Sequence, residues 1–255
     1  MSDRVALEVK GVTKYFGGLC AISRLDFGVA RGEIVGIIGP NGSGKTTLFN
    51  MITGVHQPDE GDIRFEGASI AGEKPYEVVR RGIARTSQLT KLFGRVPALG
   101  NVLMGLHCRT RAGVWGALVR GAETKVEEKK SRAKAAEILE FLGLTHVQDR
   151  PAELLSAAEQ RRLMIGNALA TQPRLLLLDE PTAGMSAEET AEVVRLIRKV
   201  RGDGVTILLI EHNMKVAMGL CDRIVAIESG TKIAEGTPDV VAGDQAVIEA
   251  YLGKD

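Results

Sequence analysis

The 255-residue sequence has few aromatic side chains, no excess of either charge, and no hydrophobic run long enough to cross a membrane. Aromatic residues make up 4% of the chain, which argues against stacking platforms for single-stranded nucleic acid. The formal net charge is +1, so no long-range field would steer the chain to nucleic acid or anionic lipid. We therefore expect no nucleic-acid partner. If the protein acts at a membrane, we expect it to associate peripherally.

Cysteine is scarce as well. Cys20, Cys108 and Cys221 are far apart, odd in number and form no Cys-x-x-Cys pair. We expect reduced, buried thiols and no disulfide framework, which is typical of a cytosolic protein. The first residues lack the apolar run of a secretion signal, which agrees with that expectation.

What the sequence does contain is a series of short apolar runs separated by helical patterns. Such runs indicate strands buried on both faces, as in a parallel sheet with helices packed against it. They lie at 34–38, 175–178, 205–210 and 223–228. Near the N-terminus, 5–9 and 25–29 alternate instead, as half-buried strands do.

A glycine-rich stretch follows the run at 34–38. Residues 39–46 read GPNGSGKT and match GxxxxGK[ST] at every fixed position, with a strand before and a helix after. Glycines let backbone N–H groups turn inward around a polyphosphate, and the helix N-terminus adds a positive dipole. We expect Lys45 to bridge the β- and γ-phosphates of a nucleotide and the Thr46 hydroxyl to bind Mg²⁺. The alternative, a plain glycine turn, is disfavoured by the complete match.

Polar residues also follow two later runs. Asp179 and Glu180 come directly after 175–178, at a strand end that can face the same crevice. We expect Asp179 to hold Mg²⁺, directly or through water, and Glu180 to polarise the attacking water; a salt-bridged surface pair is the alternative. His212 follows 205–210, where it could reach a γ-phosphate, although a structural role is equally open on pattern alone.

The middle of the chain changes character, because it lacks β-branched runs and shows helical periodicity. The predicted fold is α/β: a phosphate-loop NTPase core with a mostly parallel sheet, an N-terminal antiparallel β subdomain and an inserted helical subdomain. The expected division is 1–88 for the β subdomain and phosphate loop, 89–159 for the helical subdomain, 160–236 for the rest of the core, and 237–255 for a C-terminal helical segment.

With these motifs together, the chain resembles the nucleotide-binding subunit of ABC transporters over nearly its whole length. The stretch LSAAEQ at 155–160 is similar to the ABC signature, whose usual pattern is LSGGQ. The resemblance implies that Ser156 and the amides opening the next helix, including that of Ala158, bind the γ-phosphate of ATP held by another subunit. A serine that only caps the helix is the alternative.

The resemblance implies further roles. Phe16 corresponds to the aromatic that stacks on adenine, with Tyr15 as the alternative, and His212 to the switch histidine. Gln88 corresponds to the glutamine that senses Mg²⁺ and nucleotide and couples to the membrane subunit. The expected nucleotide-binding residues are Phe16, Gly39, Asn41, Gly42, Ser43, Gly44, Lys45, Thr46, Thr47, Ser156 and Ala158.

The chain departs from the usual signature in three residues. Ala157 and Ala158 replace two glycines; their methyl groups narrow the space for a phosphate, and alanine resists a positive φ. Glu159 adds a negative charge near a phosphate, which is unfavourable unless Arg161 or Arg162 offsets it. We expect these changes to affect turnover and tightness of the closed dimer. A further departure is Ser186, at a position where the common pattern has aspartate.

The phrases AGMSAEET, LLIEHNMKVAMGLCDRI and EGTPDVV are similar to those of ATPase subunits of branched-chain (hydrophobic) amino acid importers. This resemblance implies two permease subunits, a second ATPase subunit, identical or different, a periplasmic binding protein, and a place on the cytoplasmic face of the inner membrane. Two chains would close head to tail on two ATP. Leu92, Phe93 and Val96 would line the permease dock or belong to the core of the helical insert.

Other classes remain as alternatives. The lipopolysaccharide-export ATPase is one, because it has a similar YLG sequence near its C-terminus. A soluble ABC ATPase acting on DNA or ribosomes usually carries two cassettes or a long coiled coil, and neither is present. A phosphate-loop kinase would not need the LSxxxQ turn, and the [NT]KxD motif of a GTPase is absent.

Overall fold

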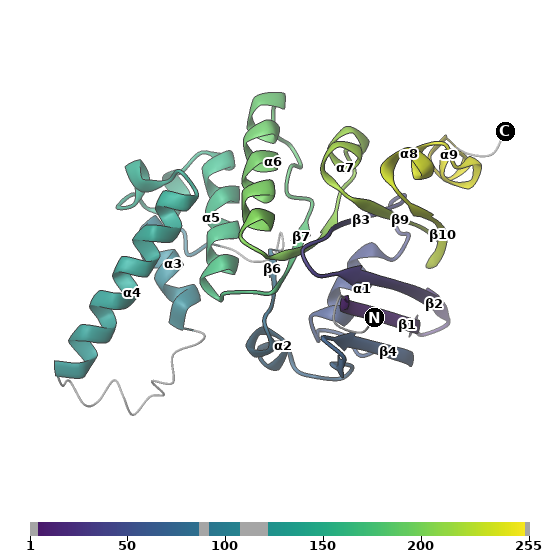
Figure 1. Cartoon of the computed structure of the whole chain (residues 1–255), viewed down its shortest axis with the longest axis horizontal. Coiled ribbons are helices and arrows are strands. Elements are labelled where there is room, and N and C mark those ends of the chain that lie inside the picture. Colours follow the sequence, from purple (N-terminus) through teal and green to yellow (C-terminus); the bar gives the residue numbers. More distant parts are fainter. Residues whose placement is uncertain (1–4, 87–91, 108–121, 253–255) are drawn as a thin grey trace. The chain divides into compact units, whose positions relative to one another are not determined.

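The computed structural model describes residues 5–86, 92–107 and 122–252 (Figure 1). The chain forms two compact units. The first consists of residues 1–85 and 174–255, and the second of residues 86–173. The four-part division expected from the sequence stays a prediction.

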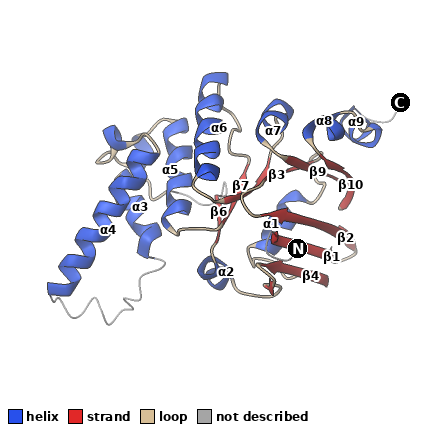
Figure 2. Ribbon diagram, in the orientation of Figure 1, coloured by secondary structure: helices blue, strands red, loops and turns tan. Residues whose placement is uncertain are grey.

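The first unit contains a six-stranded sheet in the order β10-β9-β3-β8-β7-β6 (Figure 2). β3 pairs in parallel with β8 and β9, β7 pairs in parallel with β8, and β10 runs antiparallel to β9. This confirms the predicted, mostly parallel sheet. The strands are β3 (Ile34–Ile38), β6 (Ile83–Thr86), β7 (Leu175–Asp179), β8 (Thr206–Ile210), β9 (Arg223–Glu228) and β10 (Thr231–Gly236).

The register of this sheet brings three strand ends level. Ile37 on β3 lies beside Ile210 on β8, and Ile210 lies beside Asp179 on β7. Because these strands are parallel, the segments that follow them all leave at the same edge of the sheet, where ligands bind in open α/β folds. The tertiary structure thus gathers residues 39–46, 179–180 and 211–213 from three distant parts of the chain.

The N-terminal part of the chain also forms an antiparallel sheet in the order β2-β1-β4-β5, with β3 of the parallel sheet between β2 and β4 in sequence. This confirms the predicted N-terminal β subdomain. Its strands are β1 (Val5–Phe16), β2 (Leu19–Ala30), β4 (Glu60–Phe65) and β5 (Ala68–Ser69). β1 and β2 extend beyond the alternation at 5–9 and 25–29. Register shifts between Val9 and Val12 and around Lys14 interrupt the two-residue period, so the alternation shows only part of each strand.

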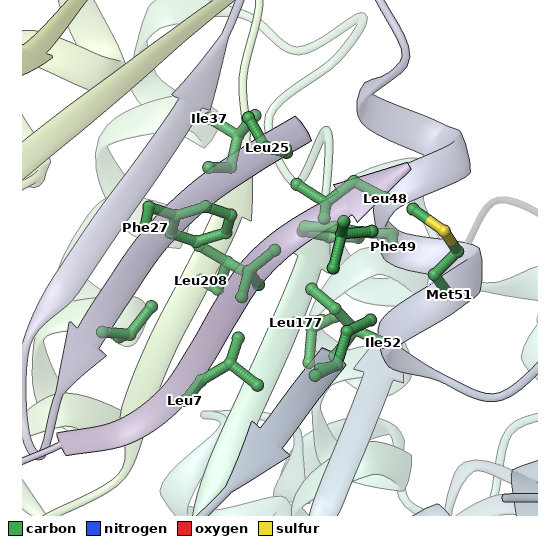
Figure 3. Packing of buried hydrophobic residues seen from close by; sticks show 14 of the residues in the cluster. Leu7, Leu25, Phe27, Ile37, Leu48, Phe49, Met51, Ile52, Leu177 and Leu208 are labelled. Atoms are coloured by element: carbon green, nitrogen blue, oxygen red, sulfur yellow. The ribbon is translucent and has the colours of Figure 1, made fainter. Parts of the chain in front are cut away.

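The core of the first unit joins both sheets to the helix after the phosphate loop, α1 (Lys45–Ile52). Leu7 and Phe27 come from the antiparallel sheet, Leu177 and Leu208 from the parallel one, and Phe49 from α1 (Figure 3). Burial of such side chains stabilises by about 1.5–3 kcal/mol each. It also holds the N-terminus of α1 against the sheet edge.

The remaining helices of the first unit are α2 (Pro75–Arg81), α6 (Ala187–Gly202), α7 (Met214–Leu220), α8 (Pro238–Ala242) and α9 (Gln245–Leu252). Ser186 caps α6: its hydroxyl accepts from the Glu189 N–H at 3.3 Å, and Glu189 accepts from the Ser186 N–H at 2.9 Å. The serine found where the common pattern has aspartate is thus a helix cap.

The second unit is helical, as predicted for the insert. It contains α3 (Ala98–His107), α4 (Ala122–Phe141) and α5 (Ala157–Ala170), with single turns at Thr145–Val147 and Ala152–Leu154. Ala135 and Leu139 of α4 are fully buried, and Gly143 has a φ of +68° just past the helix end. No helix in the described part of the chain is long and apolar enough to span a membrane.

Candidate functional site

The phosphate loop connects β3 to α1, and its conformation depends on glycine. Gly39, Gly42 and Gly44 have φ values of +151°, +80° and +101°. A Cβ atom on Gly39 would lie 2.0 Å from the carbonyl oxygen of Ile227, and one on Gly44 would lie 2.5 Å from that of Ala21. The loop therefore passes closer to its neighbours than any larger residue permits.

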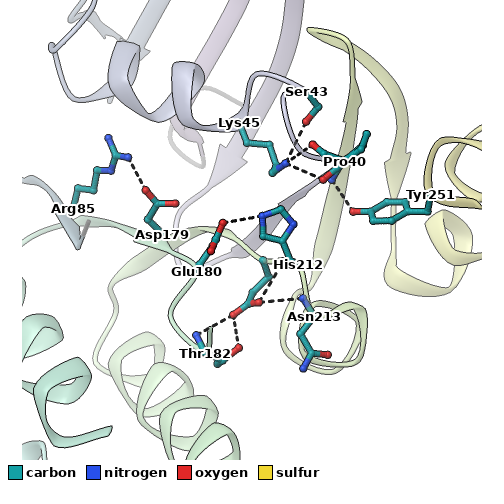
Figure 4. A network of polar contacts seen from close by, with 12 residues as sticks. Pro40, Ser43, Lys45, Arg85, Asp179, Glu180, Thr182, His212, Asn213 and Tyr251 are labelled. Carbon is teal, nitrogen blue, oxygen red and sulfur yellow. Dashed lines mark hydrogen bonds and ion pairs between the residues drawn. The ribbon is translucent and has the colours of Figure 1, made fainter. Parts of the chain in front are cut away.

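Lys45 is buried within this loop. Its Nζ donates to the carbonyl oxygens of Gly39 and Pro40, both at 2.8 Å, and to the Ser43 hydroxyl at 3.3 Å (Figure 4). Burial lowers the pKa of Lys45, and the nearby carboxylates of Glu180 and Asp179 oppose this shift. The ammonium group of Lys45 thus lies near the carboxylates of Glu180 and Asp179, at the carboxyl ends of the parallel strands.

A cleft of about 460 Å³ opens over the loop. Asn41, Ser43, Lys45, Thr46 and Thr47 line it, together with the intervening glycines. Residues from elsewhere in the first unit line it as well, among them Phe16, Glu180 and His212. The structure therefore brings together most of the residues that the sequence predicts for one nucleotide.

Phe16 ends β1 at one side of this cleft, and 43% of its surface is exposed. The ring contacts His56 edge to face, with ring centres 5.2 Å apart, and the Lys14 ammonium lies 5.6 Å from its centre. Tyr15 is not among the described residues that line the cleft. The geometry favours Phe16 over Tyr15 as the platform for a flat ring.

Glu180 and His212 face each other at the sheet edge. Glu180 Oε1 lies 2.7 Å from His212 Nε2 (Figure 4). Glu180 also has a φ of +49°, a left-handed conformation that is unfavourable for a residue with a side chain. Its backbone N–H donates to the carbonyl of Ile210 at 2.9 Å, which ties it to the end of β8.

Asp179 pairs with a residue that the motifs did not reveal. Arg85 on β6 donates to Asp179 Oδ2 at 2.6 Å and to Asn50 Oδ1 at 2.7 Å. Both members of the ion pair are 13% exposed. Arg85 lies three residues before Gln88, but a single arginine carries no pattern that indicates this contact.

The donors near the loop suit Mg²⁺, which prefers oxygen ligands and keeps several positions for water and phosphate. They are the exposed hydroxyl of Thr46 and the carboxylate of Asp179. No group of three or more His, Cys, Asp or Glu side chains that could hold a metal occurs in the described residues. An ion here would therefore depend on phosphate oxygens as well as on protein groups.

The signature-like segment lies in the second unit, at the start of α5. Ser156 is the N-cap, and its hydroxyl accepts from the Glu159 N–H at 3.3 Å. Ala157 and Ala158 are helical and have no positive φ, so the backbone here does not use the freedom of glycine. The expected effect on turnover and on tightness of the closed dimer stays a prediction. Ala157 is exposed and Ala158 is buried.

Glu159 does not carry a free charge into this segment. Burial raises its pKa, but the backbone N–H and hydroxyl of Ser156 and the ring of His146 lower it by more, so the pKa lies below its ordinary value. Glu159 accepts from the Ser156 N–H at 2.8 Å and lies 3.2 Å from His146 Nε2. The carboxylate of Glu159 thus has partners in the backbone and in His146.

Two other expectations concern the segment around residue 90. Gln88 lies outside the described residues. Phe93 is 55% exposed, whereas Leu92 and Val96 are half-buried.

The predictions about the cysteines can be checked at two of the three. Cys221 is buried as expected, and Cys20 is half-buried and lines the cleft. Cys108 lies outside the described residues.

A comparison with protein families matches residues 22–183 to the ABC transporter model. The chain belongs to the ABC transporter family. Residues 231–255 also match a family described as branched-chain amino acid ATP-binding cassette transporter. The predicted ABC ATPase and its fold class are thereby confirmed.

Curated relatives cover the ABC chain almost completely. It is 40% identical to the high-affinity branched-chain amino acid transport ATP-binding protein BraF of Pseudomonas aeruginosa, over 99% of both chains. It is 39% identical to the corresponding protein LivG of Escherichia coli, over 97% of this chain and 98% of that one.

Solved structures agree with this assignment. A nucleotide-free ATP-binding cassette from an ABC transporter superposes with a TM-score of 0.86 at 33% identity, covering 98% of this chain and all of the other. The ADP conformation of the cassette MJ1267 gives a TM-score of 0.85 at 33% identity, covering 98% of this chain and 99% of that one.

Proposed function

We propose that this ABC ATPase is the motor subunit of an importer for branched-chain or other hydrophobic amino acids. Two branched-chain amino acid transport ATP-binding proteins, BraF and LivG, share about two fifths of its residues over nearly the full length. The separate match of residues 231–255 supports the same subfamily. The substrate class rests on these similarities, because the cargo of such a machine is chosen by other subunits.

The pairing of Glu180 with His212 is the observation that carries the proposed hydrolysis. Glu180 Oε1 lies 2.7 Å from His212 Nε2, and both side chains line the cleft over the phosphate loop. A carboxylate held there can polarise a water molecule for in-line attack on a γ-phosphate. His212 orients that carboxylate and is placed to contact the same phosphate.

In this proposal the phosphate loop, residues 39–46, binds the phosphates of ATP. The amides of 42–46 and the Lys45 ammonium stabilise negative charge on the β- and γ-phosphates, and Phe16 stacks on the base. Thr46 and Asp179 would hold Mg²⁺, with Gln88 as a further contact. Bound Mg²⁺ would neutralise negative charge on the phosphates.

Ser156 and the amide of Ala158 serve a second nucleotide. In this proposal they bind the γ-phosphate of ATP held by another ATPase subunit, so two chains close head to tail on two ATP. Each closed site loses its bridging γ-phosphate contact on hydrolysis, and the pair opens. The Ser156 hydroxyl caps the Glu159 N–H. The first N–H groups of a helix in general point toward its N-terminus, where the helix dipole favours an anion.

The motor acts on membrane partners. We propose two permease subunits, a second ATPase subunit, and a periplasmic binding protein reached through them. The chain lies on the cytoplasmic face of the inner membrane as a peripheral subunit. Exposed Phe93, five residues after Gln88, supports a docking surface for a permease at this segment.

Glu180→Gln tests the hydrolytic assignment. The amide keeps the size of the side chain but cannot accept a proton, so turnover should fall by about 100-fold or more while ATP still binds. Size-exclusion chromatography with ATP should then show a trapped dimer. Glu60→Gln, an exposed carboxylate on β4, is the control and should hydrolyse ATP normally. Wild-type turnover by Glu180→Gln would refute the assignment.

Purification of the tagged chain from its native membrane in mild detergent tests the partners and subfamily. Two permease proteins with a second, distinct ATPase are expected. A lipopolysaccharide permease pair with this chain as the sole ATPase would overturn the importer proposal. Recovery only in the soluble fraction, on nucleic acid or ribosomes, would overturn the transport function altogether.

A further inference from the structure

A buried carboxylate stands directly behind the pair of Glu180 and His212. Glu211 follows the last residue of β8, and only 2% of its surface is exposed. Among the described residues it is the only acidic side chain that is buried to this degree. Because a charge withdrawn from water is costly, a carboxylate persists in such a place only where donors compensate for the lost solvent.

The two oxygens of Glu211 bind two different loops. Oε1 accepts from the hydroxyl of Thr182 at 2.6 Å and from its backbone N–H at 3.2 Å. Oε2 accepts from the backbone N–H groups of His212 at 3.1 Å and Asn213 at 3.3 Å. Figure 4 shows these contacts converging from Thr182, His212 and Asn213. One side chain thus joins the loop after β7 to the loop after β8.

The joined loops are the ones that carry the hydrolytic pair. Thr182 lies two residues after Glu180, and His212 is the immediate neighbour of Glu211. Glu180 has a φ of +49°, which a side-chain-bearing residue adopts only where its surroundings hold it there. Its N–H is held by Ile210, and the chain just beyond it is held by Glu211 through Thr182.

We propose that Glu211 is a positioning residue of the hydrolytic site, which sets the 2.7 Å approach of Glu180 and His212 by holding both loops. This inference rests on the roles proposed for those two residues. Glu211 contacts neither nucleotide nor water in this assignment. It acts through the backbone of its neighbours.

Four donors converge on Glu211, and this explains why a carboxylate is needed. An ionised carboxylate has only acceptor sites, so it satisfies all four N–H and O–H groups. A glutamine in the same place would turn an NH₂ group toward one of the two pairs of donors. An alanine would leave all four without an acceptor in a buried setting.

The decisive variant is Glu211→Gln, in the full-length chain purified with its membrane partners. We expect kcat for ATP hydrolysis to fall by about 10- to 100-fold, because a displacement of about 1 Å is enough to disrupt a hydrolytic geometry. Affinity for a fluorescent ATP analogue should change by less than about threefold, because no phosphate or base contact is removed. A purely structural role would lower the melting temperature without this separation of kcat from binding.

Glu33→Gln is the matched control. Glu33 accepts from the backbone N–H of Ala30 at 2.8 Å and from the Arg223 guanidinium, at the opposite end of β3 from the cleft. Loss of this carboxylate should lower the melting temperature and leave kcat unchanged. If Glu211→Gln behaves in the same way as Glu33→Gln, the positioning role is wrong.

A second pair of variants covers the case in which Glu211→Gln does not fold. Thr182→Val removes only the hydroxyl that donates to Glu211, whereas Thr182→Ser keeps it. The valine variant should lose kcat and the serine variant should recover most of it; equal rates in the two would overturn the proposal. If Glu180→Gln remains fully active, the proposed function itself fails. If Glu180→Gln loses activity but Glu211→Gln and Thr182→Val hydrolyse ATP at the wild-type rate, only the positioning role of Glu211 is refuted.

Discussion

The phenol oxygen of Tyr251 accepts a hydrogen bond from the backbone N–H of Gly39 at 2.8 Å, although 212 residues separate the two in sequence. Tyr251 belongs to α9, and Gly39 is the first residue of the phosphate loop (Figure 4). Gly39 is buried, so its N–H depends on this acceptor. Burial raises the pKa of Tyr251, and the hydrogen bond from Gly39 opposes the shift only in part, so the phenol keeps its proton at neutral pH.

Tyr251→Phe should therefore weaken the phosphate loop. The variant keeps the ring and removes the acceptor, which leaves the Gly39 N–H buried without its partner. We expect a loss of about 1–2 kcal/mol in the free energy of unfolding, measured by urea denaturation. Tyr76→Phe is the control, since the exposed Tyr76 donates only to neighbouring Glu77, and it should change stability by less than about 0.5 kcal/mol. Equal effects of the two variants would contradict the prediction.

The partly buried pair of Arg85 and Asp179 should be strongly coupled. Removal of either partner alone leaves an uncompensated charge at the sheet edge, so Arg85→Met should cost about 3 kcal/mol of stability. A double-mutant cycle with Asp179→Asn, measured by denaturation in EDTA, should give a coupling of about 1–3 kcal/mol.

The exposed pair of Lys134 and Glu137 on α4 provides the comparison for that cycle. Their side chains are 51% and 63% exposed, and their atoms lie 2.8 Å apart. Solvent screens such pairs, so a cycle with alanine at both positions should give about 0.5 kcal/mol or less. A coupling at Arg85 and Asp179 no larger than this would show that the short distance contributes little to stability.

Glu159→Gln should reduce stability in a pH-dependent way. The folded pKa of Glu159 lies below the ordinary 4.5, so the carboxylate binds protons more weakly in the folded chain than in the unfolded one. The extra stability is complete above about pH 4.5 and is lost as the pH falls through the folded pKa. Glutamine can still cap α5 but has no charge.

Thermal melts of wild type and Glu159→Gln between about pH 3 and 7 test this directly. The difference in melting temperature should be largest near neutral pH and should shrink toward the acid end. Glu137→Gln, which removes an exposed carboxylate on α4, should show a smaller difference throughout. A difference for Glu159→Gln that grows on acidification would contradict the prediction.

The cysteines should differ in reactivity. Burial, followed by the negative charges of Asp222 and Glu211, raises the pKa of Cys221 to about 12. Since the thiolate is the reactive form, only about one part in 10⁴ of Cys221 is reactive at pH 8. Cys20 is half-buried and lines the cleft, so iodoacetamide should label it before Cys221, and ATP should slow that labelling. Peptide mass spectrometry reads both sites, and rapid labelling of Cys221 in the folded chain would contradict the prediction.

Much of the fold and the candidate site was predictable because the relevant patterns are contiguous. The run at 34–38 matches β3 in both bounds, and the stretch from Gly39 to Thr46 is a phosphate loop whose three glycines have positive φ. Glu180 and His212 were candidates because each lies within two residues of the end of a buried strand. Parallel strands end at a common edge, so a local pattern was enough to place both residues there.

Contacts between distant segments were not predictable in this way. Arg85, Glu211 and Tyr251 each lie in unremarkable local sequence, and their importance comes from a partner that only folding brings near: Asp179, Thr182 and Gly39. Glu159 is a further case, because its carboxylate accepts from a backbone N–H and lies beside His146, and the sequence pattern indicated neither partner.

The sequence by itself determined the phosphate loop, the buried strands and the order of helices and strands, because the side-chain periods and the glycine requirement act over a few residues. Only the tertiary structure decided which loops meet, how Glu180 reaches its left-handed conformation, and which donors surround Glu211. Those outcomes depend on register between strands far apart in the chain, and no local period encodes that register.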